Sequence, residues 1–193
     1  MITLSLVGLL FAAIVISTVI PDYTDEEVDE MFDEVVEEIT TYTQVKDKTG
    51  KYSGEYPNET ITKVAILITP LVSIQINMSG ITTKLDNGEY AKMISYNGDA
   101  DVMDSGFLFE HPIWNNLTID EFGFLVINDE DHSITDYDII NKNSDMTYII
   151  FRLQDELAMR FQEEMTVTLF PSTGWQKTIH LEAGLPTSSI VHL

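Results

Sequence analysis

The chain has 193 residues, enough for one domain with an appendage, and its 32 acidic against 10 basic side chains give a formal charge of −22. This charge excludes nucleic-acid binding, because a phosphate backbone would be repelled over the whole surface. The chain contains no cysteine, so disulfides, thiolate metal sites and cysteine nucleophiles are excluded as well.

An uncharged apolar segment at 1–20 opens the chain and ends at Pro21. Such a segment forms a helix of about 30 Å, which can cross a bilayer or fill the core of a helical bundle. Three interpretations remain open: a signal segment, a membrane anchor, or the packing helix of a secreted filament. The first Lys or Arg is Lys46, so the segment lacks the basic flank of a signal peptide and the positive charge that orients an anchor. The pattern favours the filament helix.

Small residues within this segment support close packing between helices. Gly8, Ala12 and Ser17 fall near one helical face and allow neighbouring helices to approach. A subunit of this kind would lie in the membrane only before assembly. The residues expected to form the polymerisation helix are Met1, Ile2, Leu4, Leu6, Gly8, Leu9, Phe11, Ala12, Ile14, Val15, Ile16 and Val19.

A second helical pattern follows, in which Val28, Val35 and Ile39 lie on one apolar stripe. The other faces carry ten acids between Asp22 and Glu38 and no cation. Like charges four residues apart destabilise an isolated helix, so this segment needs its stripe to be packed. If copies of it lie side by side, its acids must be screened or bridged by cations.

The remainder is predicted to be rich in β-strands. Residues 50–57 are rich in turn formers and are interpreted as a linker, which places a filament-core helix at 1–48 and an outer β-domain at 49–193. Asn87-Gly88 and Asn97-Gly98 are predicted turns. The segments predicted as strands are Thr62–Thr69, Val72–Ile76, Tyr90–Tyr96, Phe122–Ile127, Thr147–Leu153, Met165–Phe170 and Trp175–Leu181. The predicted fold class is therefore α+β, a long N-terminal hydrophobic helix followed by an immunoglobulin-like antiparallel β-sandwich.

Four segments are similar to one known family. They are ITKVAILITPL at 61–71, IQINMS at 74–79, MTVTLFP with Gly174 at 165–174, and LPTSSIVHL at 185–193. In their order and spacing, together with the apolar head, the chain resembles archaellins, the filament subunits of the archaeal flagellum (archaellum). The residues at 97–145 match only loosely.

Several features depart from the archaellin pattern. The chain opens Met1-Ile2-Thr3 instead of with a Gly-Ile-Gly-Thr-like tetrad, and its helix continuation is acidic instead of rich in Gln, Thr and Ala. No basic leader precedes Met1, so either the leader has been removed or the chain has none. Ser5 stands where bacterial type IV pilins carry a glutamate, which points to the archaeal branch.

The resemblance implies a structural role in a type IV pilin-like filament outside the cell. The helices would bundle into a core, the β-domains would form a sheath, and a membrane motor would rotate the filament for swimming. The implied partners are further copies of the chain, other archaellins, and the archaellum motor and accessory proteins. Two alternatives stay open: an adhesive archaeal pilin, and a membrane-anchored accessory protein that binds the S-layer.

The chain carries no nucleophile elbow, phosphate-binding loop or His-Glu metalloprotease helix, so we expect a non-enzyme with no required cofactor. Three sequons, at Asn58, Asn77 and Asn116, are candidate N-glycosylation sites, which the resemblance also implies. Acidic pairs in predicted loops are candidate ligands for Ca²⁺ or Mg²⁺, although solvated loop acid is the interpretation that their composition favours. These pairs are Asp129 with Asp131, and Asp99 with Asp101.

Overall fold

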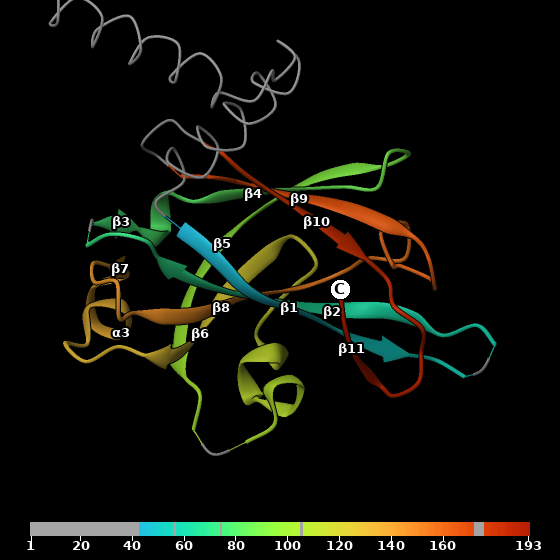
Figure 1. The fold of residues 1–193 in the computed structure, drawn as a ribbon, viewed down its shortest axis with the longest axis horizontal. Coiled ribbons are helices and arrows are strands. Elements are labelled where there is room, and N and C mark those ends of the chain that lie inside the picture. Colours follow the sequence, from blue (N-terminus) through green and yellow to red (C-terminus); the bar gives the residue numbers. More distant parts are fainter. Residues whose placement is uncertain (1–42, 56, 74, 105, 172–175) are drawn as a thin grey trace, which may run out of the picture. The chain divides into compact units, whose positions relative to one another are not determined.

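The structure is a computed structural model that describes residues 43–55, 57–73, 75–104, 106–171 and 176–193 (Figure 1). The predicted polymerisation helix and the acidic segment 22–38 lie outside the described residues. Within the described ranges, no helix is long and apolar enough to span a membrane. The strands are β1 (Thr43–Ser53), β2 (Thr60–Pro70), β3 (Ile76–Asn77), β4 (Thr82–Asp86), β5 (Ala91–Val102), β6 (Glu121–Asn128), β7 (Ile139–Ile140), β8 (Met146–Arg152), β9 (Glu164–Phe170), β10 (Lys177–Glu182) and β11 (Ile190–His192).

Helical turns are short in this part of the chain. They are η1 (Met78–Gly80), η2 (Leu108–Glu110), η3 (Pro112–Asn115) and α3 (Ser133–Tyr137). The mostly β character that the sequence predicts is confirmed for the described residues.

Nine strands form one continuous curled sheet in the order β10-β9-β4-β5-β6-β8-β2-β1-β11, and β3 pairs with β7 separately. Two separate antiparallel sheets were predicted, and this is wrong because β5 joins both halves. Its residues Ala91–Ser95 pair antiparallel with β4, and Ser95–Val102 then pair parallel with β6. The strand bends at Asn97-Gly98, where Gly98 has φ +88°. This dipeptide therefore bends a strand and does not reverse the chain, whereas Asn87-Gly88 does form the predicted turn between β4 and β5.

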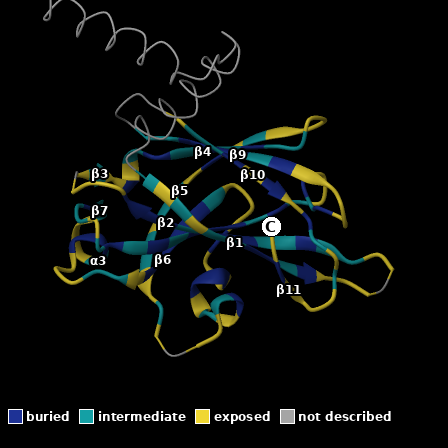
Figure 2. Cartoon of the chain, viewed as in Figure 1, coloured by how far each residue is buried: buried dark blue, intermediate teal, exposed yellow. Residues whose placement is uncertain are grey.

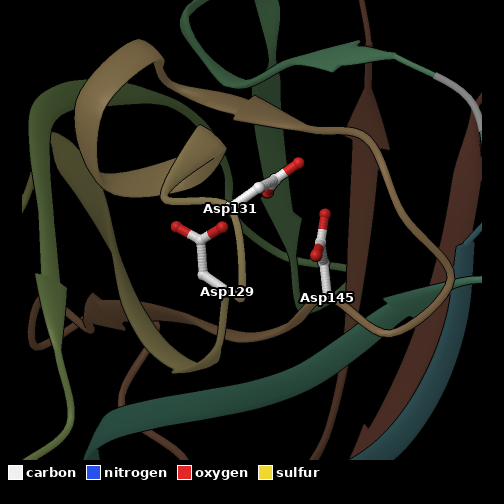
Figure 3. A group of neighbouring side chains, drawn as sticks. All are labelled: Asp129, Asp131 and Asp145. Atoms are coloured by element: carbon white, nitrogen blue, oxygen red, sulfur yellow. The ribbon is translucent and has the colours of Figure 1, made fainter.

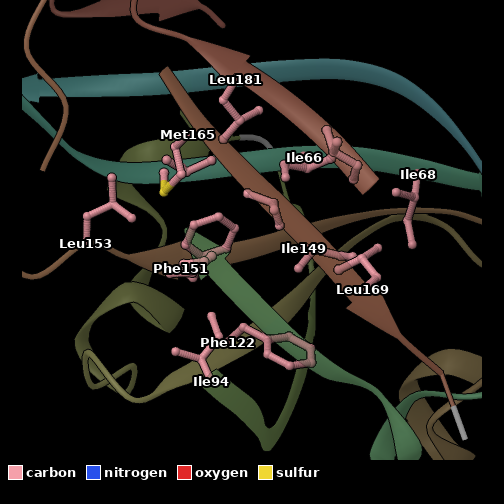
Figure 4. Close-up of a cluster of buried hydrophobic side chains, with 14 of the residues drawn as sticks. Ile66, Ile68, Ile94, Phe122, Ile149, Phe151, Leu153, Met165, Leu169 and Leu181 are labelled. Carbon is pink, nitrogen blue, oxygen red and sulfur yellow. The ribbon is translucent and has the colours of Figure 1, made fainter. Parts of the chain in front are cut away.

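The main core fills the space between the two halves of the curled sheet (Figure 4). In β9, Met165, Val167 and Leu169 point inward, as their alternation with threonines predicts. They belong to the same buried cluster as Ile149 and Phe151 of β8. Figure 2 shows the buried residues concentrated along the strands and the exposed ones on the connections. Burial of these apolar side chains, worth about 1.5–3 kcal/mol each, stabilises the fold.

A second, smaller core covers the opposite face of the central strands. Leu125 of β6 and Ile150 of β8 pack there beneath Phe109 and Trp114, which come from the two helical turns η2 and η3. The indole Nε1 of Trp114 donates a hydrogen bond to the carbonyl oxygen of Leu108 (2.8 Å), which fixes this cover. The central strands are consequently buried on both faces.

Strand β1 contradicts the predicted linker at 50–57 and the predicted domain boundary at 48. Residues 43–53 form one strand that pairs with β2 and β11, so 43–48 belong to the sheet. A Cβ on Gly50 would lie 2.9 Å from Cγ2 of the fully buried Ile61. Gly50 is therefore a close-packing residue in a strand and not part of a flexible linker. The strand predicted at 72–76 is also wrong for most of its length, since β3 begins at Ile76.

The role of Gly50 gives a prediction with a definite sign. We expect Gly50→Ala to lower the free energy of unfolding of the β-domain by about 1–3 kcal/mol, because the added methyl group overpacks against Ile61. Urea denaturation measures this, with Gln44→Ala, at an exposed position of the same strand, as the control within about 0.5 kcal/mol of the unmodified protein. In a flexible linker, Gly50→Ala would be neutral or stabilising, and that result would contradict the account.

Candidate cation site

The pairing of β6 with β8 brings two aspartates together at one end of the sheet. Asn128 lies opposite Met146 in the antiparallel register, so Asp129 follows β6 where Asp145 precedes β8. The connection between these strands contains α3 and β7 and also carries Asp131. One carboxylate oxygen from each of the three aspartates lies within 4.8 Å of the others (Figure 3).

Asp129 is held by the start of α3. Its Oδ1 accepts a hydrogen bond from the backbone N–H of Ser133 (3.0 Å), and its Oδ2 accepts from those of Ile134 (3.0 Å) and Thr135 (3.1 Å). These are N–H groups that a helix leaves without intrahelical partners at its first turn. The carboxylate is therefore fixed in position by the local backbone.

Asp145 is the buried member of the group, with 1% of its surface exposed. Its Oδ2 accepts hydrogen bonds from the backbone N–H groups of Asn141 (2.9 Å) and Lys142 (2.8 Å). Its Oδ1 and the Oδ1 of Asn141 are buried without a hydrogen-bond partner among the described residues. A buried oxygen left unpaired costs about 1–3 kcal/mol, and more when it is charged, so both oxygens need a further partner.

Lys142 supplies one positive charge at the edge of the group. Its Nζ lies 3.1 Å from Oδ2 of Asp131, and the side-chain amide of Asn141 donates to the same oxygen (3.2 Å). The ammonium group of Lys142 holds the pKa of Asp131 well below its usual range, and Asp131 in turn raises the pKa of Lys142. The positive charge of Lys142 neutralises one of the three carboxylates, so two negative charges remain uncompensated.

The oxygen donors suit a hard cation. The group consists of three carboxylates and contains no thiolate or imidazole, and all-oxygen donors are what Ca²⁺ and Mg²⁺ prefer. Asp129 and Asp131, singled out in the sequence, are thus brought together. Asp145 was missed, because only the register of β6 against β8 places it beside Asp129.

The other predicted pair does not join this group. Asp99 and Asp101 lie in β5 and not in a loop, because the chain continues through Asn97-Gly98 without reversing. The Oδ2 of Asp99 accepts a hydrogen bond from the side-chain amide of Asn97 (3.1 Å), and Asp101 lies 4.0 Å from Nε2 of His111.

The three sequon asparagines are exposed. Asn58 lies in the turn between β1 and β2, and Asn116 follows η3. The Oδ1 of Asn77, by contrast, accepts hydrogen bonds from the backbone N–H and the hydroxyl of Ser79 (3.0 and 2.6 Å). All three are accessible for modification, and Asn77 is the one with its amide oxygen already bonded.

No family profile and no curated protein sequence matches this chain. Among solved structures, the chain is similar to the archaeal flagellin FlaB1 from Methanocaldococcus jannaschii, with a TM-score of 0.64 and 21% identity over 78% of this chain and 94% of that one. Weaker likenesses are to the archaeal flagellum of Methanospirillum hungatei (TM-score 0.48, 8% identity, 99% and 96% covered) and to the archaellum stator complex of FlaF and FlaG from Sulfolobus acidocaldarius (TM-score 0.43, 12% identity, 73% and 89% covered). The resemblance to archaellins is therefore confirmed at the level of the fold, through FlaB1.

Proposed function

We propose that this chain is the structural subunit of an archaellum, a helical surface filament rotated for swimming. The observation that carries the proposal is the joining of an uncharged 20-residue N-terminal segment to a β-domain with the fold of an archaeal flagellin. The segment would form the long helix of the filament core, and the β-domain would form the outer layer of a type IV pilin-like filament.

Elementary energetics support assembly through the apolar segment. Each of its large apolar side chains gains about 1.5–3 kcal/mol when it moves from water into a bundle of identical helices. A head-to-tail contact between identical helices that does not close into a ring generates a helical filament. The partners would be further copies of the chain, possible companion archaellins, and the membrane motor and accessory proteins. Catalysis has no place in this role.

Filament composition tests the proposal. Surface filaments sheared from cells that make this chain are expected to contain it as their main polypeptide, and deletion of its gene is expected to abolish both the filaments and swimming. Electron microscopy, mass spectrometry of the main band and motility assays measure these outcomes. Loss of surface attachment with normal swimming would instead identify an adhesive pilin. Retention in detergent-extracted membranes as a scarce protein would identify an accessory anchor.

We also propose that Asp129, Asp131 and Asp145 bind one Ca²⁺ or Mg²⁺ ion. The support is the unpartnered Oδ1 of the buried Asp145, whose carboxylate lies in one group with those of Asp129 and Asp131. A cation there would neutralise the two carboxylate charges that Lys142 leaves, and it would tie the 129–145 connection to the ends of β6 and β8. In a chain of charge −22, it would also reduce repulsion between subunits.

Cation binding predicts a thermal shift that depends on Asp145. At saturating Ca²⁺ the melting temperature of the unmodified protein is expected to exceed that in chelator by about 5–10 °C, since a ligand at 100 times its Kd contributes about 2.7 kcal/mol. Asp145→Asn, which keeps the shape but removes the charge, is expected to abolish this difference, whereas Asp101→Asn keeps it. An unmodified protein with equal melting temperatures in Ca²⁺, Mg²⁺ and chelator would show that the three aspartates bind no cation.

Glycans are proposed at the exposed Asn58, Asn77 and Asn116. Their exposure and their sequons support this, and Asn58 and Asn116 are the preferred acceptors because, unlike Asn77, they form no side-chain hydrogen bond among the described residues. Peptide masses from the sheared filaments test the assignment site by site.

A further inference from the structure

Three of the chain's ten basic residues stand in one line across three neighbouring strands. Lys51 of β1 lies opposite Lys63 of β2, and Lys63 lies opposite Arg152 of β8. Residues directly opposite in antiparallel strands have Cβ atoms about 4.5–5.5 Å apart and point to the same face of the sheet. We call these three residues the basic row.

The basic row lies on the outer face of the sheet. The Nζ of Lys63 is 4.9 Å from the ring centroid of Trp114, which belongs to the smaller core covered by η2 and η3. Lys63 also donates a hydrogen bond to the carbonyl oxygen of Phe109 (3.4 Å). All three side chains are only half-buried, so the row faces the surroundings of the domain.

Within the described ranges, no carboxylate pairs with any residue of the basic row. Lys84, Lys92 and Lys142 form ion pairs with Asp86, Asp120 and Asp131. In this described part of the chain Lys51, Lys63 and Arg152 form none, as is also true of Lys46, Lys48, Arg160 and Lys177, but only the three residues of the basic row stand opposite one another in the sheet.

The acid next to Arg152 in the strand register forms no ion pair with it among the described residues. Phe122 of β6 lies opposite Phe151 of β8 in the antiparallel register. Glu121, the residue before Phe122, therefore lies next to Arg152, the residue after Phe151. The Oε2 of Glu121 accepts a hydrogen bond from the hydroxyl of Thr118 (2.9 Å) instead of pairing with Arg152.

Three like charges in one register destabilise the sheet on their own. Directly opposed cations repel each other across strands, and burial, then Arg152 and Lys51, lower the pKa of Lys63. The acids of the chain outnumber its bases by 32 to 10. These three cations lie together, and none of them pairs with any of the described acids. This arrangement indicates that an acidic partner outside the domain neutralises the row.

The chain itself contains a segment with the complementary charge. Residues 22–38 carry ten acids and no base. In a filament, many copies of this segment would lie near many copies of the outer domain. We propose that the basic row of one subunit binds the acidic segment 22–38 of a second copy of this chain. The inference rests on the proposed filament function and assigns a surface to its subunit contact.

Charge reversal in the full chain tests this contact. Lys51→Glu with Arg152→Glu is expected to reduce the filament yield about tenfold, since like charges facing each other across an interface cost several kcal/mol. Lys63 is left unchanged because it packs on Trp114. The control is Lys46→Glu with Lys177→Glu, which makes the same charge change on β1 and β10 away from the row and is expected to leave the yield unchanged.

A second charge reversal, in the acidic segment, tests whether this segment is the surface that the basic row contacts. Asp33→Lys with Glu37→Lys, added to the reversed row, is expected to restore the filament yield. Copies that carry only the reversed row and copies that carry only the reversed segment are expected to assemble when mixed in one cell but not alone. If filaments form when both reversals are in one chain, but not when the two singly reversed variants are mixed, the contact lies within one chain. That result would overturn the proposal.

Two other results would also overturn it: normal filaments from the reversed row, or failure of compensation in a chain whose urea midpoint is unchanged. Both are distinct from failure of the proposed function. In that case, the unmodified chain would be missing from the filaments in the first place.

Discussion

The position of β8 between β2 and β6 is the constraint on which the other features of this domain depend. Ile149 and Phe151 point into the main core, and Ile150 between them points into the smaller one. A strand buried on both faces cannot slip by one residue without turning each of these side chains to the wrong side. The register of the three central strands is therefore the most strongly determined part of the fold.

The charged features lie at the two ends of that same strand. Asp145 immediately precedes β8 and meets Asp129 at the end of β6, whereas Arg152 closes β8 beside Lys63 of β2. One register thus places a group of carboxylates at one end of the central strands and a line of cations at the other. In a filament subunit, this arrangement would let a cation stabilise one end while the other end meets a neighbouring chain.

The sequence predicts the strands that are rich in apolar and β-branched residues, and it misses strands that only their pairing partners define. β2, β6, β8, β9 and β10 are predicted because β-branched and apolar residues dominate them. β1 is missed because its first half falls within the segment predicted as the N-terminal helix and turn formers such as Gly50 and Ser53 make its second half resemble a linker, although Gly50 is required by contact with Ile61. The bend of β5 is missed because Asn97-Gly98 has the composition of a turn, and a local pattern does not show that both sides pair in one sheet.

The same limit applies to the sites. Asp129 and Asp131 are close in sequence and could be singled out, but Asp145 joins them only through strand pairing. The basic row has no sequence signature at all, since Lys51, Lys63 and Arg152 become neighbours only in the register of three strands. Spacing along a chain identifies ligands within one loop, whereas sites made across a sheet require the topology.

The central claim is that this domain is the repeating outer unit of a filament whose core is made by the N-terminal segment. Helical reconstruction by cryo-electron microscopy of filaments from cells that make this chain tests it most directly. The account predicts an outer layer in which every subunit fits the nine-stranded curled sheet, joined to a core of packed apolar helices. A filament whose outer density follows another fold, or whose subunits lack the apolar helix, would contradict it.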